Sequence, residues 1–328
     1  MKHTFKSLMS RLSKAGYKRD FVNATLIPDW WDDDCEQQVN VLQELEIRIA
    51  RFLKLPLSDI RNPDSPLRTP AYPNAQLRQV RDIDRDKLSP AIHAAIQIAA
   101  ATVRSMRNKP STVLLPSVDP NIWRKELINT GNSVKLDRVL SSLWHLGIPV
   151  IPIENLPAPS FQGFACVVEK CPVIVIGHKF DEPSHVAFLV AHEVAHLTAG
   201  DCREDMPVVD YEENVSDESD IERKADAFAS FVMTGSKSSF DLAGSDFKDL
   251  ARNAIALEKK EGIDAGTLIF AWAKKTKKYD IATLAVKALY RHCGARNTLN
   301  KFFFENVDLD SASDTDRDLL KSVTAKNA

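Results

Sequence analysis

His192-Glu193-Val194-Ala195-His196 lies near the end of an apolar, helix-compatible stretch, and this pentapeptide decides how the centre of the chain folds. Residues four apart share one face of a helix, so both imidazoles can reach a single metal ion. Glu193 lies about 100° further round the helix than His192, which puts its carboxylate beside the metal rather than on it. The spacing predicts a catalytic zinc site in which Glu193 takes a proton from a water that the zinc activates.

The residues around the pentapeptide favour a helix of defined length. The stretch 184–191 is apolar, and we expect Asp181 or Ser184 to cap the start of the helix. Gly200 stands where a glycine commonly ends a helix. The histidine pair therefore has the helical support that a metal site requires.

A second segment, 219–231, carries apolar residues at helical spacing and offers the third ligand. Glu222 and Asp226 are four residues apart and share a face. A catalytic zinc ion keeps three protein ligands and one open position, and histidine ligands usually donate their second ring N–H to a carboxylate. We therefore expect Glu222 to complete the metal site and Asp226 to orient one of the histidines.

Each of these residues also has a purely structural interpretation. His192 and His196 fit ordinary histidines on a half-buried helix. Glu222 fits a helix capping box that begins at Ser219. Asp226 fits an ion pair with a neighbouring lysine or arginine. These alternatives compete with the metal-site hypothesis.

Other residues near the two segments compete with the predicted site or flank it. Three acids are rival third ligands: Asp217, Glu218 and Asp220. Two histidines fall outside the helical face of the pair and are expected on the surface or in the core: His178 and His185. Two residues are weak candidates for a second electrophile that would stabilise the oxyanion: Tyr211 and Arg223. Cys202 is expected to lie away from the metal, because the helix ends before it.

Five short segments around the predicted site follow one another in a distinctive order. They are 143–151, which ends in Gly-Ile-Pro-Val-Ile, then Gly-Phe-Ala at 163–165, the apolar 172–176, the start of the zinc motif at 188–193, and Glu-Arg-Lys-Ala-Asp-Ala-Phe-Ala at 222–229. This order resembles the ImmA/IrrE family of zinc metallo-endopeptidases. The resemblance covers roughly residues 140–235, under a third of the chain.

The resemblance implies a zincin-like core, in which a small sheet packs on the helix that carries the histidine pair. It also implies that this pair and Glu222 bind the metal and that Glu193 is the general base. The sequence departs from the family at Asp226, where asparagine is common, and at 231–234, where Phe-Val-Met-Thr replaces a Leu-Leu-Met-Pro run. Neither change touches a ligand, so both bear on substrate preference more than on catalysis.

Length and composition indicate an ordinary soluble protein with more than one domain. The chain has 328 residues, of which 44% are hydrophobic and 27% charged. Its net charge of −2 gives no general attraction to nucleic acid or membranes. We find no apolar run of membrane-spanning length and no secretory signal. Five cysteines without framework spacing indicate reduced thiols and a cytoplasmic location.

The chain divides into four stretches, and the expected class is α+β, mainly helical. The stretches are a helical, diverged helix-turn-helix-like domain at 1–65, a linker and helical segment at 66–139, the metallopeptidase core at 140–240, and C-terminal helices with an acidic tail at 241–328. Strands are expected at 148–153 and in a hairpin over 163–168 and 172–178. The tail is polar from Asp308 onward, so we expect disorder at its end.

The N-terminal domain is similar to the helix-turn-helix of bacterial repressors, with 46–55 near its end. ImmA/IrrE proteins are often tied to such repressors. Three adjacent carboxylates, Asp32-Asp33-Asp34, lie near the recognition position and would repel DNA phosphates. The basic face of 2–19 argues the other way. We favour a protein-docking or structural role for this domain over DNA binding.

The stretch 201–222 is the most unbalanced in charge, with ten acidic residues and one arginine. Its simplest interpretation is a solvated loop. The functional alternative is a lid or a docking surface for a basic partner, a description that fits a DNA-binding repressor.

The sequence favours a zinc endopeptidase that cleaves a regulatory protein, such as a helix-turn-helix repressor, in a stress, phage or mobile-element response. Manganese could replace zinc, because these ligand types alone do not fix the metal. One alternative is a zinc hydrolase with another substrate class. Another is a non-catalytic module that contains zinc and binds protein or DNA through its N-terminal domain. The sequence does not indicate an oligomeric state.

Overall fold

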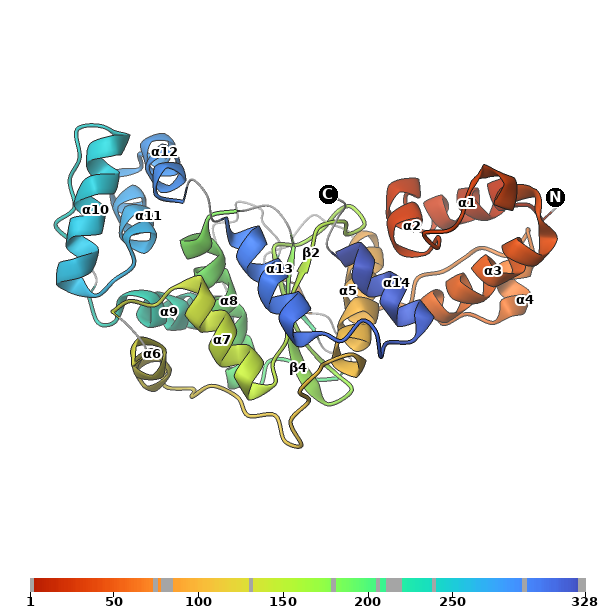
Figure 1. Ribbon diagram of the computed structural model, residues 1–328, viewed down its shortest axis with the longest axis horizontal. Helices are drawn as coiled ribbons and strands as arrows, with labels where there is room; N and C mark the ends of the chain where they lie inside the picture. The colour runs from red at the N-terminus through yellow and green to blue at the C-terminus, as the bar shows by residue number, and fades with distance from the viewer. Residues whose placement is uncertain are drawn as a thin grey trace.

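The computed structural model describes residues 3–72, 76–77, 85–129, 132–177, 181–204, 207–210, 220–237, 240–290 and 294–323. Within these residues it contains fourteen α-helices, one short 3-10 helix and five β-strands. The protein is therefore α+β and mainly helical, which confirms the class predicted from the sequence. Figure 1 shows the small sheet near the middle of the molecule, with helical units at both ends.

The five strands form one mixed sheet in the order β1-β5-β3-β4-β2. Their bounds are Gln76–Leu77 for β1, Val150–Ile153 for β2, Gly163–Val168 for β3, Cys171–Gly177 for β4 and Val208–Asp210 for β5. β2 pairs with β4 in parallel, and β1 with β5 in parallel, whereas β3 runs antiparallel to both β4 and β5. The largely buried residues of β2 and β4 are the continuous apolar runs typical of strands covered on both faces.

The predicted hairpin is present between β3 and β4. Its two connecting residues, Glu169 and Lys170, have positive φ angles of 50° and 64°, which is the backbone that a tight two-residue hairpin turn favours. Strands β1 and β5 were not predicted, because two or three residues give too little alternation of polar and apolar positions to indicate a strand.

Helices cover both faces of the sheet. In Figure 1, α8 (Pro183–Ala199) and α7 (Leu136–Leu146) lie on one side, and α5 (Arg85–Arg104) lies on the other. α13 (Ala295–Asn306) runs beside α7 and β2. This arrangement places α8, which carries the histidine pair, against β3.

Four α-helices and the 3-10 helix form an N-terminal unit at one end of the molecule (Figure 1). They are α1 (Phe5–Lys14), α2 (Arg19–Thr25), η1 (Asp33–Gln37), α3 (Val39–Leu53) and α4 (Leu57–Arg61). The apolar side chains of this unit belong to the same buried cluster as those of the sheet. The ring of Phe52, for example, packs edge-on against His93 of α5, with centroids 5.2 Å apart.

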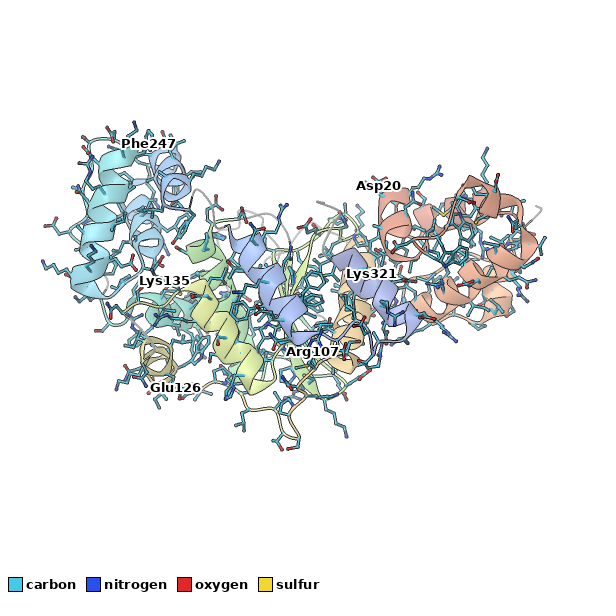
Figure 2. The ribbon with its side chains drawn as sticks, viewed as in Figure 1. Asp20, Arg107, Glu126, Lys135, Phe247 and Lys321 are labelled. Atoms are coloured by element: carbon cyan, nitrogen blue, oxygen red, sulfur yellow. The ribbon has the colours of Figure 1, made fainter. Side chains whose placement is uncertain are left out.

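The opposite end of the molecule is also helical. It contains α6 (Pro120–Ile128), α9 (Asp220–Thr234), α10 (Phe247–Glu261), α11 (Ala265–Thr276) and α12 (Tyr279–Leu289). The last three share a second buried cluster. Lys135, labelled in Figure 2 at the start of α7, joins this unit to the core through an ion pair of 2.9 Å with Glu258. Among the described residues, none of the helices combines the length with the apolar character that crossing a membrane requires.

The sequence predicted a polar, acidic tail from Asp308 onward with disorder at its end, and it did not predict the helix that residues 314–323 form. These residues form α14 (Asp314–Val323), which packs against α5 and α2. Leu319, Leu320 and Val323 are buried, because their spacing gives the helix one apolar face. Residues 324–328 lie outside the described residues.

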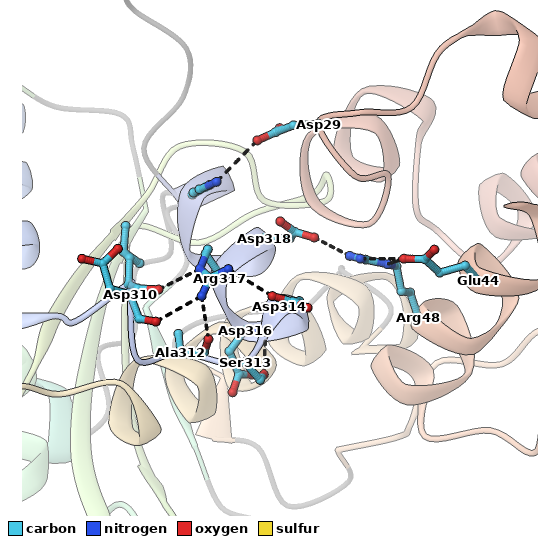
Figure 3. Close-up of polar contacts among 12 residues, drawn as sticks. Asp29, Glu44, Arg48, Asp310, Ala312, Ser313, Asp314, Asp316, Arg317 and Asp318 are labelled. Carbon is cyan, nitrogen blue, oxygen red and sulfur yellow. Dashed lines mark hydrogen bonds and ion pairs between the residues drawn. The ribbon is translucent and has the colours of Figure 1, made fainter.

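Ion pairs lie on both sides of α14, and Figure 3 shows those that join it to the N-terminal unit. Asp318 pairs with Arg48 of α3, and Lys321 lies 3.7 Å from Asp29. On the core side, Arg104 of α5 makes two hydrogen bonds of 3.0 and 2.6 Å to Asp316. The last helix of the chain therefore connects the N-terminal unit to the sheet.

Candidate metal centre

The helix that carries the histidine pair has the predicted end but not the predicted start. Gly200 ends α8 with a φ of 77°, in the left-handed region that favours glycine. At the start, Glu182 occupies the cap position without a side-chain cap hydrogen bond. The Ser184 hydroxyl instead donates to Asp264, and Asp181 accepts from the backbone of Arg296. Neither residue that the sequence favoured as a cap therefore has that role.

The structure brings His192, His196 and Glu222 together at the point where α8 faces α9. The three ligand atoms lie within 4.8 Å of one another, and all three residues are buried. The two Nε2 atoms are 3.1 Å apart. The carboxylate oxygens of Glu222 lie 3.2 Å from His192 Nε2 and 3.7 Å from His196 Nε2. This group could hold one metal ion.

Carboxylates fix the orientation of both imidazoles. His192 Nδ1 lies 2.8 Å from Asp226 Oδ1, and His196 Nδ1 lies 3.1 Å from Asp201 Oδ2. An ionised carboxylate can only accept, so each Nδ1 must carry the proton. In a neutral imidazole, Nε2 then presents a lone pair. Two lone pairs and the Glu222 carboxylate thus converge on one point, where a cation would relieve their repulsion.

Asp201 was missed by the sequence reasoning. It follows Gly200 directly, where the chain leaves the helix and turns back toward His196. Its Oδ2 is the nearest carboxylate to the Nδ1 of that histidine. The available signal was an acidic residue that directly follows the glycine at the end of the helix, five residues after the metal ligand His196. This signal does not fix the path of the loop after Gly200, and that path decides whether the carboxylate turns back toward His196.

Burial decides the protonation state of His196. Removal from water lowers the pKa of His196, and the neighbouring His192 lowers it further. The imidazole of His196 is therefore neutral near pH 7, the form in which a histidine binds a metal.

The Glu193 side chain is fully buried between α8 and β3. A Cβ atom at Gly163 of β3 would overlap Oε1 of Glu193, and it would lie 3.1 Å from a Leu189 methyl. The absence of a side chain at Gly163 therefore creates the space that holds this carboxylate. Because Gly163 has no left-handed φ, close approach rather than backbone conformation explains the glycine.

The cysteines near the site are protonated thiols. Burial raises the pKa of Cys202, and the charge of Glu193 raises it further. Burial likewise raises the pKa of Cys166 well above its ordinary value. The sequence predicted that Cys202 lies away from the metal, and this residue is not a member of the ligand group. Neither cysteine belongs to the group of His192, His196 and Glu222.

Several other residues singled out in the sequence take no part in this group. The ring of His185 packs edge-on against Phe270, with centroids 5.7 Å apart. Asp220 and Arg223 are exposed and pair with each other. The remaining candidates lie outside the described residues: His178, Tyr211, Asp217, Glu218 and Ser219. The same holds for much of the acidic stretch 201–222.

No protein-family model matches the sequence, and no curated protein is significantly similar to it.

Proposed function

We propose that this protein is a zinc-dependent endopeptidase of the ImmA/IrrE kind. The observation that carries the proposal is the buried group of His192, His196 and Glu222, with the Glu193 carboxylate on the adjoining face of the same helix. Three ligands leave a fourth position open, as catalytic zinc sites do, whereas structural sites use four protein ligands. Among the described residues, the group contains three side chains.

The spacing of the three ligand groups is compatible with zinc. Ligands about 2.1 Å from a tetrahedral zinc ion lie about 3.4 Å from one another. The two Nε2 atoms are 3.1 Å apart, Glu222 Oε2 lies 3.2 Å from His192 Nε2, and Glu222 Oε1 lies 3.7 Å from His196 Nε2. Two imidazoles and a carboxylate also suit manganese, so the choice of zinc rests on the motif together with the spacing.

When bound, zinc would supply Lewis-acid chemistry: it polarises the scissile carbonyl and makes the attacking water more acidic. Glu193 then accepts a proton from that water and passes it to the leaving amine, as a general base and then a general acid. Asp226 and Asp201 hold the two imidazoles with Nε2 toward the shared point. Gly163 leaves room for the Glu193 carboxylate in its position against β3.

The proposed substrate is a regulatory protein, with a helix-turn-helix repressor as the leading class. This part of the proposal rests on the family resemblance of residues 140–235 and on the acidic stretch 201–222, which suits a basic partner. We further propose that the activity is cytoplasmic and belongs to a stress, phage or mobile-element response.

The deciding experiment compares new protein N-termini in host cells that express the wild type or Glu193→Gln, with and without DNA-damaging stress. We expect one regulator to be cut only by the wild type. Glu193→Gln should retain bound zinc, because Glu193 is not a ligand, and the zinc content of both purified proteins serves as the control. Equal cleavage patterns from two zinc-loaded proteins in both conditions would favour a non-catalytic zinc module instead.

A further inference from the structure

A groove lies between α9, the helix of Glu222 and Asp226, and α11 of the C-terminal unit. It has a volume of about 850 Å³. Its walls come from α9, from the turn that follows it and from the end of α11. We call it the α9–α11 groove, and its lining includes Ser230, Phe231, Phe240, Trp272, Lys274 and Lys275.

Most of the exposed lining of the groove is apolar. Phe231, Phe240 and Trp272 are only half-buried, so their rings keep surface exposed to the groove. Half-exposed aromatic rings that gather in one concave site are more typical of an interaction surface than of a solvated face. The groove therefore suits apolar side chains of a partner.

The charge of the groove is entirely positive. Lys237, Lys274 and Lys275 line it, and no acidic residue is among its described lining residues. Lys237 pairs with Glu261, whereas Lys274 and Lys275 are exposed. Two further exposed lysines, 277 and 278, follow directly after α11. A partner would therefore need acidic residues to complement the rim.

The groove and the metal centre share helix α9. Glu222, Asp226, Ser230 and Thr234 follow one another at intervals of four on this helix, so each lies about 40° further round than the one before. The first two belong to the metal centre, and the last two line the groove. Ser230 lies about 12 Å along the helix axis from Glu222, a span of about four extended residues.

We propose that the α9–α11 groove binds an extended, acidic segment of a protein through apolar side chains that fill it and carboxylates that meet Lys274 and Lys275. In a substrate, such a segment would hold the chain a few residues from the metal centre. This second statement rests on the proposed peptidase function, whereas the binding itself does not.

The test measures binding with the full-length, zinc-loaded Glu193→Gln protein, which keeps the probe intact. The probe is a fluorescently labelled synthetic peptide in which glutamate alternates with phenylalanine and leucine. We expect the double substitution Lys274→Glu/Lys275→Glu to weaken binding at least about tenfold, since each change turns an attraction into a repulsion. Binding should also weaken as salt is raised.

The matched control is Lys259→Glu/Lys260→Glu. It makes the same change of net charge at an exposed lysine pair of α10 that does not line the groove. A second variant, Ser230→Trp, fills the groove at an exposed position without changing charge and should also weaken binding. Equal affinities for the two double variants would overturn the proposal, as would unchanged binding to Ser230→Trp.

Two further probes separate the remaining outcomes. A peptide with serine in place of phenylalanine and leucine should bind much more weakly, and equal binding would refute the apolar part of the site. Single-stranded DNA that displaces the peptide at lower concentration would identify a nucleic acid as the occupant and overturn the proposal. A third outcome is that the peptide binds in the groove but the wild type cuts no protein in cells. This result would support the docking site and contradict the peptidase function.

Discussion

At the scale of single residues, Gly163 shows how a missing side chain can be part of a site. A Cβ atom there would overlap the Glu193 carboxylate, while the backbone of β3 accepts alanine without strain. Gly163→Ala should therefore displace the carboxylate and leave the fold intact. We expect turnover of the regulator that the wild type cuts to fall about a hundredfold, the usual cost of a misplacement near 1 Å, with zinc content unchanged.

Ala165→Gly is the matched control for this variant. It changes the same face of the same strand two residues away, and it removes a methyl group instead of adding one. It should cost about 1 kcal/mol of stability and leave turnover close to that of the wild type. Equal turnover of Gly163→Ala and the wild type would show that Glu193 does not need its position against β3.

Asp201 provides a second test at this scale, with a readout that does not depend on catalysis. Asp201→Asn keeps an oxygen that can accept from His196 Nδ1 but removes the charge that makes this imidazole a stronger ligand. We expect zinc affinity, measured by competition with a chelator, to fall by about ten- to a hundredfold. Asp241→Asn, at an exposed position before α10, should leave it unchanged. An unaltered affinity in Asp201→Asn would mean that the carboxylate has no influence on the metal centre.

At the scale of elements, the sequence predicted those whose signals are local. Helix α8 ends at Gly200, which has a positive φ angle, and the β3–β4 hairpin consists of two apolar runs around a tight turn. α6 was missed although a signal was present, because Asp119 and Pro120 form a common helix start and Asp119 does cap it.

The remaining misses depend on contacts distant in sequence. β5 is a strand only because it pairs with β3, and β1 only because it pairs with β5. Ser184 does not cap α8, because its hydroxyl bonds to Asp264, eighty residues further along the chain. The ligand group of the candidate site was predictable, since the chemistry of a metal site restricts spacing and residue type. Asp201 and Gly163 were not predicted, because their roles depend on the path of a loop and on the packing of a strand.

At the scale of the whole molecule, the two ends of the chain meet through α14. One buried cluster runs from Phe5 of α1 to Val323 of α14, and it includes the core of the sheet. The last helix packs against α2 of the N-terminal unit and against α5, which covers the sheet face away from α8. Folding of the N-terminal unit and of the core should therefore be coupled, with little effect on the geometry of the metal centre.

Leu320→Ala tests this coupling. Leu320 is fully buried, so its truncation removes apolar contacts and leaves a cavity between α14 and its neighbours. We expect the free energy of unfolding, measured in urea, to fall by about 3 kcal/mol in a single transition. Zinc affinity should not change, because α14 lies on the face of the sheet opposite α8.

The control is Lys321→Ala. The Lys321 side chain is 49% exposed and lies 3.7 Å from an exposed carboxylate, so this substitution should change stability by less than about 1 kcal/mol. If Leu320→Ala instead separates unfolding into two transitions, the N-terminal unit folds independently and α14 is only a tether. If it lowers zinc affinity, the two faces of the sheet are coupled, and the metal centre depends on the end of the chain.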